Sequence, residues 1–137
     1  MNNRTIMMQI IELKGTEKRL YQLVAPLVMN PQVLKQNNNY PFRTAENFRW
    51  FVAVEGRKVV GFLPLEYKRH EVLINNYYVK DNDAVVLTAL LEKVIDSMEE
   101  GKTLTSITLV EHEDLFRELG FSAEKMWRRY VKMIKEK

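Results

Sequence analysis

The chain has 137 residues, of which 46% are hydrophobic and 28% are charged. This length and balance predict one globular domain over residues 1–137, with a core that needs no disulfide or metal for its stability. The absence of cysteine excludes disulfides and thiolate chemistry, and the net charge of +3 is only mildly basic. Because no apolar run approaches about 18 residues and the N-terminus has no signal-peptide pattern, we expect a cytoplasmic protein without a membrane partner.

The N-terminal third predicts one strand followed by two helices. Residues 6–13 are mostly apolar and predict a strand, and Thr16 is expected to cap a helix whose apolar residues recur at helical spacing. Pro26 lies inside that pattern and predicts a kink or an early end. Asn30 and Pro31 are expected to begin a short second helix, as its cap and its first residue.

The middle of the chain predicts three strands. From Phe48 the apolar period changes to two, so residues 48–55 and 59–67 are expected to form a hairpin. Pro64 has no backbone donor and requires a bulge or an unpaired position. Residues 72–79 predict a third strand.

The C-terminal half predicts alternating helices and strands. Residues 84–99 form a helical pattern that ends before Gly101, and residues 104–110, 111–119 and 125–134 predict a strand, a short helix and a final strand. The helix has one apolar stripe, made of Leu87, Leu90, Leu91, Val94, Ile95 and Met98. The order β-α-α-β-β-β-α-β-α-β predicts an α/β (α+β) fold, with a mixed, mostly antiparallel sheet and helices on both faces.

That order resembles the GNAT superfamily of N-acetyltransferases, over nearly the whole chain. Residues 51–62 resemble the family's second and third strands, residues 89–92 the body of its coenzyme-binding helix, and residues 115–121 the Leu-Gly-Phe ending of its last helix. The resemblance implies transfer of an acetyl group from acetyl-coenzyme A to an amine.

The turn before the coenzyme-binding helix departs from the family pattern. The resemblance implies glycines there, whose amides hold the pyrophosphate of coenzyme A at a helix N-terminus. Alignment on residues 89–92 puts Val85 and Leu87 at the glycine positions, with Asp81 and Asp83 in the region meant for an anion. Carboxylates there stabilise the helix through its dipole and compete with a pyrophosphate, and helix capping alone would explain them.

The resemblance also implies where the arm of acetyl-coenzyme A that carries the acetyl thioester, here called the acyl arm, would lie. A tyrosine acid of the family's last helix is replaced by Phe116, so Tyr77, Tyr78 or water would carry the proton to the thiolate. The arm is expected beside the strand at residues 72–79, where it separates from its parallel neighbour at residues 104–110. The expected residues in contact with acetyl-coenzyme A are Asn76, Tyr77, Tyr78, Val79, Ala84 and Val85.

Other titratable residues have weaker signals. His70 and Glu71 are candidate bases in a turn, and His112 is expected to be a surface residue. Histidines this far apart in the sequence do not predict a metal site.

Three readings of the function remain open. The first is a divergent N-acyltransferase that uses acetyl-coenzyme A and a small-molecule or peptide amine. The second is a catalytically inactive GNAT-fold binding or interaction module that has lost coenzyme A binding. The third is a nucleic-acid contact through the basic C-terminus, although a solvated basic face is the more expected explanation of these charges and nucleic acid is the less expected partner. The basic residues are Lys125, Arg128, Arg129, Lys132, Lys135 and Lys137. The sequence allows a homodimer without predicting one.

Overall fold

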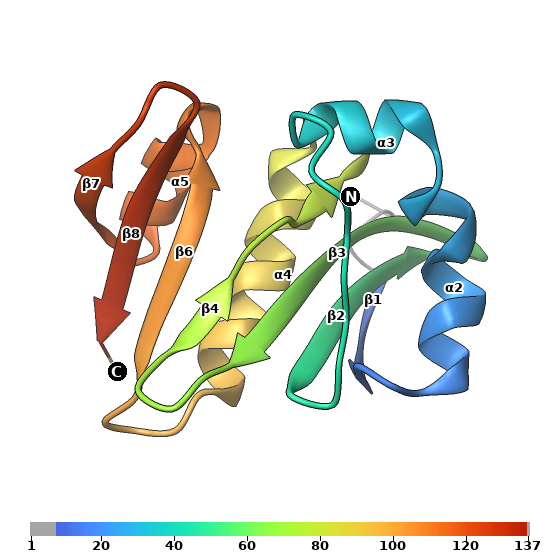
Figure 1. Ribbon diagram of the computed structural model, residues 1–137, viewed down its shortest axis with the longest axis horizontal. Coiled ribbons are helices and arrows are strands. Elements are labelled where there is room, and N and C mark those ends of the chain that lie inside the picture. Colours follow the sequence, from blue (N-terminus) through green and yellow to red (C-terminus); the bar gives the residue numbers. More distant parts are fainter. Residues whose placement is uncertain (1–7, 137) are drawn as a thin grey trace, which may run out of the picture.

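The computed structural model describes residues 8–136, shown in Figure 1. The expected strand residues Ile6 and Met7, and the basic Lys137, lie outside the described residues. No helix in the described range is long and apolar enough to cross a membrane.

Within residues 8–136 one eight-stranded sheet has the strand order β1-β2-β3-β4-β6-β8-β7, and β5 pairs with β3. Its strands are β1 (Met8–Lys14), β2 (Phe48–Glu55), β3 (Lys58–Tyr67), β4 (Val72–Ile74), β5 (Tyr78–Val79), β6 (Thr103–Leu109), β7 (Ser122–Met126) and β8 (Tyr130–Glu136). The β4–β6 pair is parallel and the other pairs of described strands are antiparallel. The expected mixed, mostly antiparallel sheet is confirmed.

Helices cover both faces of this sheet. The helices are α2 (Lys18–Val28), α3 (Pro31–Gln36), α4 (Ala84–Ser97) and α5 (Glu113–Glu118), with two short 3-10 helices, η1 (Lys80–Asn82) and η2 (Val110–His112). Figure 1 shows α4 and α5 behind the sheet. Neighbouring residues of β2 point to opposite faces: Phe51 packs in the core under α4, whereas Trp50 packs with α2 and α3.

The stripe of α4 forms the centre of the larger core. Leu87, Leu90, Leu91 and Val94 are fully buried, and Met98 is buried at the end of the helix. The predicted amphipathic helix is confirmed, although it ends at Ser97, earlier than expected.

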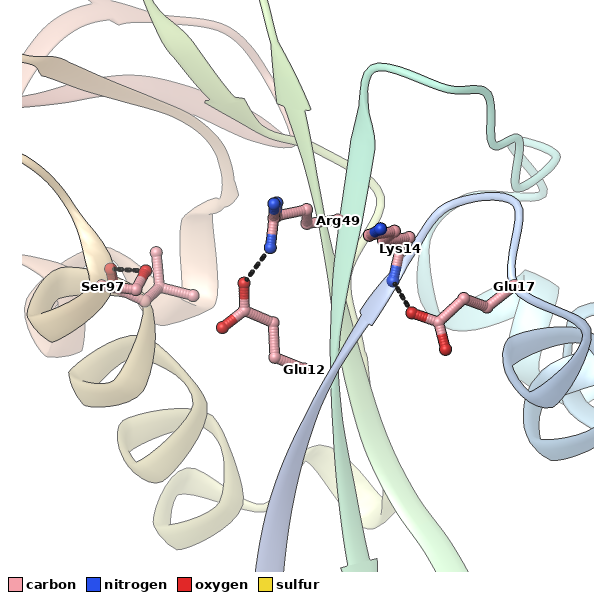
Figure 2. A network of polar contacts seen from close by, with 6 residues as sticks. Glu12, Lys14, Glu17, Arg49 and Ser97 are labelled. Carbon is pink, nitrogen blue, oxygen red and sulfur yellow. Dashed lines mark hydrogen bonds and ion pairs between the residues drawn. The ribbon is translucent and has the colours of Figure 1, made fainter.

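Two expectations for the first helix are corrected. Glu17, not Thr16, precedes the helix, because the Glu17 carboxylate accepts a hydrogen bond from the Lys14 amide and closes the turn after β1 (Figure 2). The helix also continues past Pro26 to Val28, so the early end expected at this proline is wrong. Asn30 caps α3 and Pro31 is its first residue, as expected.

The predicted final strand is two strands. Residues 127–129 form a turn between β7 and β8, which pair as an antiparallel hairpin. Because this turn contains neither glycine nor proline, the sequence carried no signal for it.

A surface ion pair joins β1 and β2 at the other edge of the sheet. Figure 2 shows Glu12 of β1 and Arg49 of β2 pointing toward each other, with 2.9 Å between the carboxylate and the guanidinium. Both side chains are largely exposed, so the pair adds little stability.

Candidate functional site

The predicted strand at residues 72–79 is broken in the middle of the sheet. Ile74 pairs with Leu65 and Tyr78 pairs with Phe62, so two residues of β3 oppose the three residues 75–77. This mismatch is a β-bulge, and Asn76 within it has a left-handed φ of 59°. Pro64 lies opposite the bulge, where its missing N–H costs no ladder bond, which confirms the expected bulge at that position.

The bulge coincides with a separation of strands. The parallel pairing of β4 and β6 covers Val72–Ile74, and beyond it β5 pairs with β3 and with no other described strand. Figure 1 shows β4 and β6 close at one end and diverging toward α3. The expected separation at the C-terminal ends of these neighbours is confirmed.

A glutamine side chain occupies the uncovered edge of β5. Gln36, at the end of α3, donates a hydrogen bond to the Val79 carbonyl at 2.8 Å and accepts one from the Val79 amide at 3.1 Å. The carboxamide thereby pairs with the strand edge as another peptide group would. This contact could not be predicted from the sequence, because Gln36 belongs to a different element.

Tyr77 bridges the separated strands from within the core. Its buried hydroxyl accepts a hydrogen bond from the Leu109 amide at 3.1 Å and lies 2.7 Å from Nδ1 of His112. Nε2 of His112 lies 2.5 Å from Oδ1 of Asn82 in η1. The expectation that His112 is a surface residue is wrong: it is 6% exposed, because η2 turns it back toward β5.

The protonation states in this chain follow from burial. Burial lowers the pKa of His112 and raises the pKa of Tyr77, so both groups are neutral near pH 7. The amide oxygen of Asn82 requires a proton on Nε2, so Nδ1 accepts the proton that the Tyr77 hydroxyl donates.

Tyr78 points to the other face of the sheet. Its ring packs against Phe62 at 5.5 Å between centroids, in the core under α2 and α3, and burial raises its pKa. The two expected proton-relay tyrosines therefore lie on opposite faces, and it is Tyr77 that bridges toward β6.

A groove opens where the strands separate. It has a volume of about 430 Å³ and is lined by Lys35, Gln36, Asn38, Asn82, Leu109, Val110, Glu111, Arg128 and Arg129. Three cations face one carboxylate in this set, and we call it the basic groove. Part of the basic C-terminal cluster thus lies beside the separated strands, where it can attract an anion.

A second cavity, of about 400 Å³, lies on the sheet face opposite α4 and α5. Its residues are Asn37, Tyr40, Pro41, Phe42, Arg43, Phe48, Pro64, Glu66, Leu73, Asn75, Asn76, Ile107, Trp127 and Tyr130, and we call it the aromatic pocket. Asn76 donates to the Pro41 carbonyl at 2.8 Å and accepts from Asn37, whose Oδ1 accepts from the Tyr130 hydroxyl at 2.6 Å. This network fixes the bulge against the loop after α3 and against β8.

The start of α4 lies apart from these contacts. Asp83 caps the helix by accepting from the Val85 amide at 2.9 Å and the Val86 amide at 3.4 Å. Ala84 and Val85 line a shallow surface between α4 and β1, and Leu87 is buried. The turn needs no glycine because Asp81 and Asn82 adopt left-handed φ angles of 55° and 56°.

The candidate bases are far from the bulge along β4. His70 is exposed in the turn before β4, and Glu71 accepts a hydrogen bond from Thr105 at 2.9 Å. Within residues 8–136 no three metal-ligating side chains gather into one cluster.

Comparison with known proteins gives a match at the level of structure. No family model matches the sequence, and no curated protein matches it. Escherichia coli ElaA superposes with a TM-score of 0.77 at 12% identity, covering 93% of this chain and 99% of that chain. A GNAT family acetyltransferase from Elizabethkingia anophelis, solved with acetyl-coenzyme A bound, has a TM-score of 0.58 at 13% identity and covers 96% and 99%.

The chain has the GNAT fold. An acyl-coenzyme A N-acyltransferase from Pseudomonas aeruginosa has the same arrangement, with a TM-score of 0.70 at 12% identity over 93% of this chain and 99% of that chain. The segments that resembled GNAT strands and helices occupy β2–β3, α4 and the end of α5. Gly61 in that hairpin permits close packing, because a Cβ there would lie 2.9 Å from the Tyr78 carbonyl oxygen.

Phe116, which stands where the resemblance implied a tyrosine acid, is a core residue. It is fully buried and packs against Tyr77 and Phe121, with ring centroids 5.9 and 5.1 Å away. A hydroxyl at this position would be buried among aromatic rings, which explains why phenylalanine suits it.

Proposed function

We propose that the protein is an N-acyltransferase that uses acetyl-coenzyme A and an amine acceptor. The observation that carries the proposal is the donor–acceptor edge of Val79, which no described strand pairs where β4 and β6 separate and which the Gln36 carboxamide covers. An amide in an incoming ligand can make the same two hydrogen bonds. The GNAT-fold neighbours, one of them solved with acetyl-coenzyme A, support this assignment.

The residues around the separated strands fit such a ligand in part. Lys35, Arg128 and Arg129 in the basic groove would attract its phosphates, in place of the α4 amides that Asp83 occupies. Of the residues expected to contact it, Val79, Tyr77 and Asn76 adjoin the separation, whereas Ala84 and Val85 would meet only an outer part of the ligand.

Acetyl-coenzyme A supplies an acetyl group bonded to sulfur. A neutral amine, formed by loss of one proton from the ammonium, attacks the carbonyl carbon; the C–N bond forms, the C–S bond breaks, and the nitrogen releases a second proton. A backbone N–H of the bulge, which has no ladder partner opposite it, would polarise the carbonyl.

The thiolate takes one proton, which we assign to Tyr77 rather than Tyr78. The Leu109 N–H would stabilise the oxygen left behind, and the second proton that the nitrogen releases would restore the hydroxyl. Because burial raises the pKa of Tyr77, this donation requires the hydroxyl to recover a proton in the same step.

Calorimetric titration with acetyl-coenzyme A tests the proposal, followed by thiol release with a mixture of amines. We expect saturable binding and release of free thiol that depends on the amine. Binding without thiol release would contradict the transfer activity, and the absence of binding would refute the acyltransferase in favour of the inactive module that has lost coenzyme A binding.

A further inference from the structure

The aromatic pocket has the size and walls of a small-molecule site. Its volume of about 400 Å³ lies within the usual range for such sites. Tyr40, Phe42 and Trp127 form its walls, and Leu73 and Ile107 lie on its floor. Such a lining favours a ligand with an apolar or aromatic body.

The charged groups of the pocket form one exchangeable pair. Glu66 is its one carboxylate among the described residues and Arg43 its one guanidinium, with 2.8 Å between them. The Glu66 side chain is 15% exposed and that of Arg43 is 67% exposed. The ion pair contributes little stability because Arg43 is exposed. Leaving the mostly buried Glu66 carboxylate without a cation would nevertheless cost free energy. A ligand that opens the pair must therefore bring a cation for Glu66.

The surroundings disfavour a ligand with positive charge alone. A shallow cavity whose lining includes Tyr40, Trp127, Arg128 and Arg129 adjoins the aromatic pocket, and Arg43 would be freed within the aromatic pocket itself. A carboxylate on the ligand would bind Arg43 and lower the repulsion. A zwitterion is the ligand that leaves neither member of the pair without a partner.

We propose that the aromatic pocket binds a free α-amino acid with a large apolar or aromatic side chain. Glu66 holds its ammonium, Arg43 holds its carboxylate and the rings of the pocket surround its side chain. One part of this proposal rests on the proposed acyltransferase: the amino group of the bound amino acid is then the acceptor. The reaction yields an N-acetyl amino acid, free thiol and one proton.

Binding can be measured without acetyl-coenzyme A. Trp127 lines the pocket at 41% exposure, whereas Trp50 is 2% exposed in the core, so a ligand-dependent change of fluorescence reports on the pocket. We expect L-phenylalanine to bind at least tenfold more tightly than phenethylamine, which lacks the carboxylate, and 3-phenylpropionate, which lacks the amine. Equal affinity for phenylalanine and phenethylamine would overturn the proposal.

Variants assign each charge to its partner. Arg43→Gln should weaken phenylalanine at least tenfold and leave phenethylamine unchanged, whereas Glu66→Gln should weaken both. Arg49→Gln is the matched control, because Arg49 forms an exposed ion pair of similar length with Glu12 outside the pocket. An equal effect of Arg43→Gln on the two ligands, or an effect of Arg49→Gln, would contradict the assignment.

Failure of this assignment can be told from failure of the acyltransferase. If phenylalanine binds as described but acetyl-coenzyme A does not bind and no N-acetylphenylalanine forms, the acyltransferase is wrong and the pocket assignment stands. If acetyl-coenzyme A binds and a peptide N-terminus is acetylated while free phenylalanine neither binds nor reacts, the pocket assignment is wrong and the acyltransferase stands.

Discussion

The hydroxyl of Tyr77 has two partners in the core, and Tyr77→Phe removes both hydrogen bonds at once. The Leu109 amide and His112 would remain buried without that oxygen, so we expect a loss of about 1–3 kcal/mol in the free energy of unfolding. If Tyr77 also protonates the thiolate, turnover falls while acetyl-coenzyme A binding persists. Denaturant titration, steady-state kinetics and calorimetry separate the two effects.

Tyr78→Phe is the matched control for that experiment. No hydrogen bond of the Tyr78 hydroxyl is seen within residues 8–136, and the ring remains in its core. Its stability should change by less than about 0.5 kcal/mol and its turnover should be retained. Unchanged turnover in both variants would leave water as the proton carrier.

His112 makes stability depend on pH. Since burial lowers its folded-state pKa below the ordinary 6.5, the unfolded chain binds the proton more readily. The contribution of His112 is therefore complete above about pH 6.5 and is lost as the pH falls toward the lower folded-state pKa. Urea denaturation at several pH values should show a slope in this range that His112→Gln reduces.

His70→Gln is the comparison for this slope, because His70 is exposed in the turn before β4. It should behave as the unmodified protein does. A slope that His112→Gln leaves unaltered would assign the pH dependence to other groups.

At the scale of elements, α4 binds the sheet through its apolar stripe. Leu91 is fully buried at the centre of that stripe, so Leu91→Ala should cost about 2–5 kcal/mol in the free energy of unfolding. The adjacent Glu92 is exposed, and Glu92→Ala should change stability by less than about 0.5 kcal/mol. Similar values for the two variants in denaturant titration would contradict the packing described.

The contact between α3 and β5 should oppose ligand binding. Gln36→Ala frees the Val79 edge, whose groups water can then reach through the groove, so acetyl-coenzyme A no longer has to displace the carboxamide. We expect tighter binding by about 1 kcal/mol, roughly fivefold, by calorimetry. Gln32→Ala changes an exposed residue of the same helix and is the control. Unaltered or weaker binding of acetyl-coenzyme A by Gln36→Ala would show that the carboxamide does not compete with it for Val79.

At the scale of the whole molecule, periodicity predicted most of the fold. The β2–β3 hairpin, the stripe of α4 and the mixed sheet follow from local patterns that one face of a strand or helix imposes on the sequence. The β7–β8 turn was missed because residues 127–129 carry no turn-forming residue, and the break at residues 75–77 was missed because only Pro64, on the neighbouring strand, indicated it.

The candidate site was predictable only in part for the same reason. Resemblance pointed to Tyr77 and Val79, but their partners Gln36 and His112 come from elements distant in the sequence. His112 looks like a surface residue by its polar neighbours, and only the packing of η2 against β5 buries it. Contacts of this kind depend on tertiary structure and leave no period in the chain.

The consecutive residues Gln36 and Asn37 form hydrogen bonds to the broken strand on either side of Tyr77. Gln36 bonds to Val79, and Asn37 bonds to Asn76. Gln36 faces the basic groove and Asn37 faces the aromatic pocket, so the two cavities share one peptide link. We expect a molecule that dislodges Gln36 to shift Asn37 as well and so to change the wall of the aromatic pocket. Thermodynamic linkage makes such an effect reciprocal. A ligand in the basic groove and a ligand in the aromatic pocket should each change the dissociation constant of the other ligand by the same factor, which paired titrations can measure.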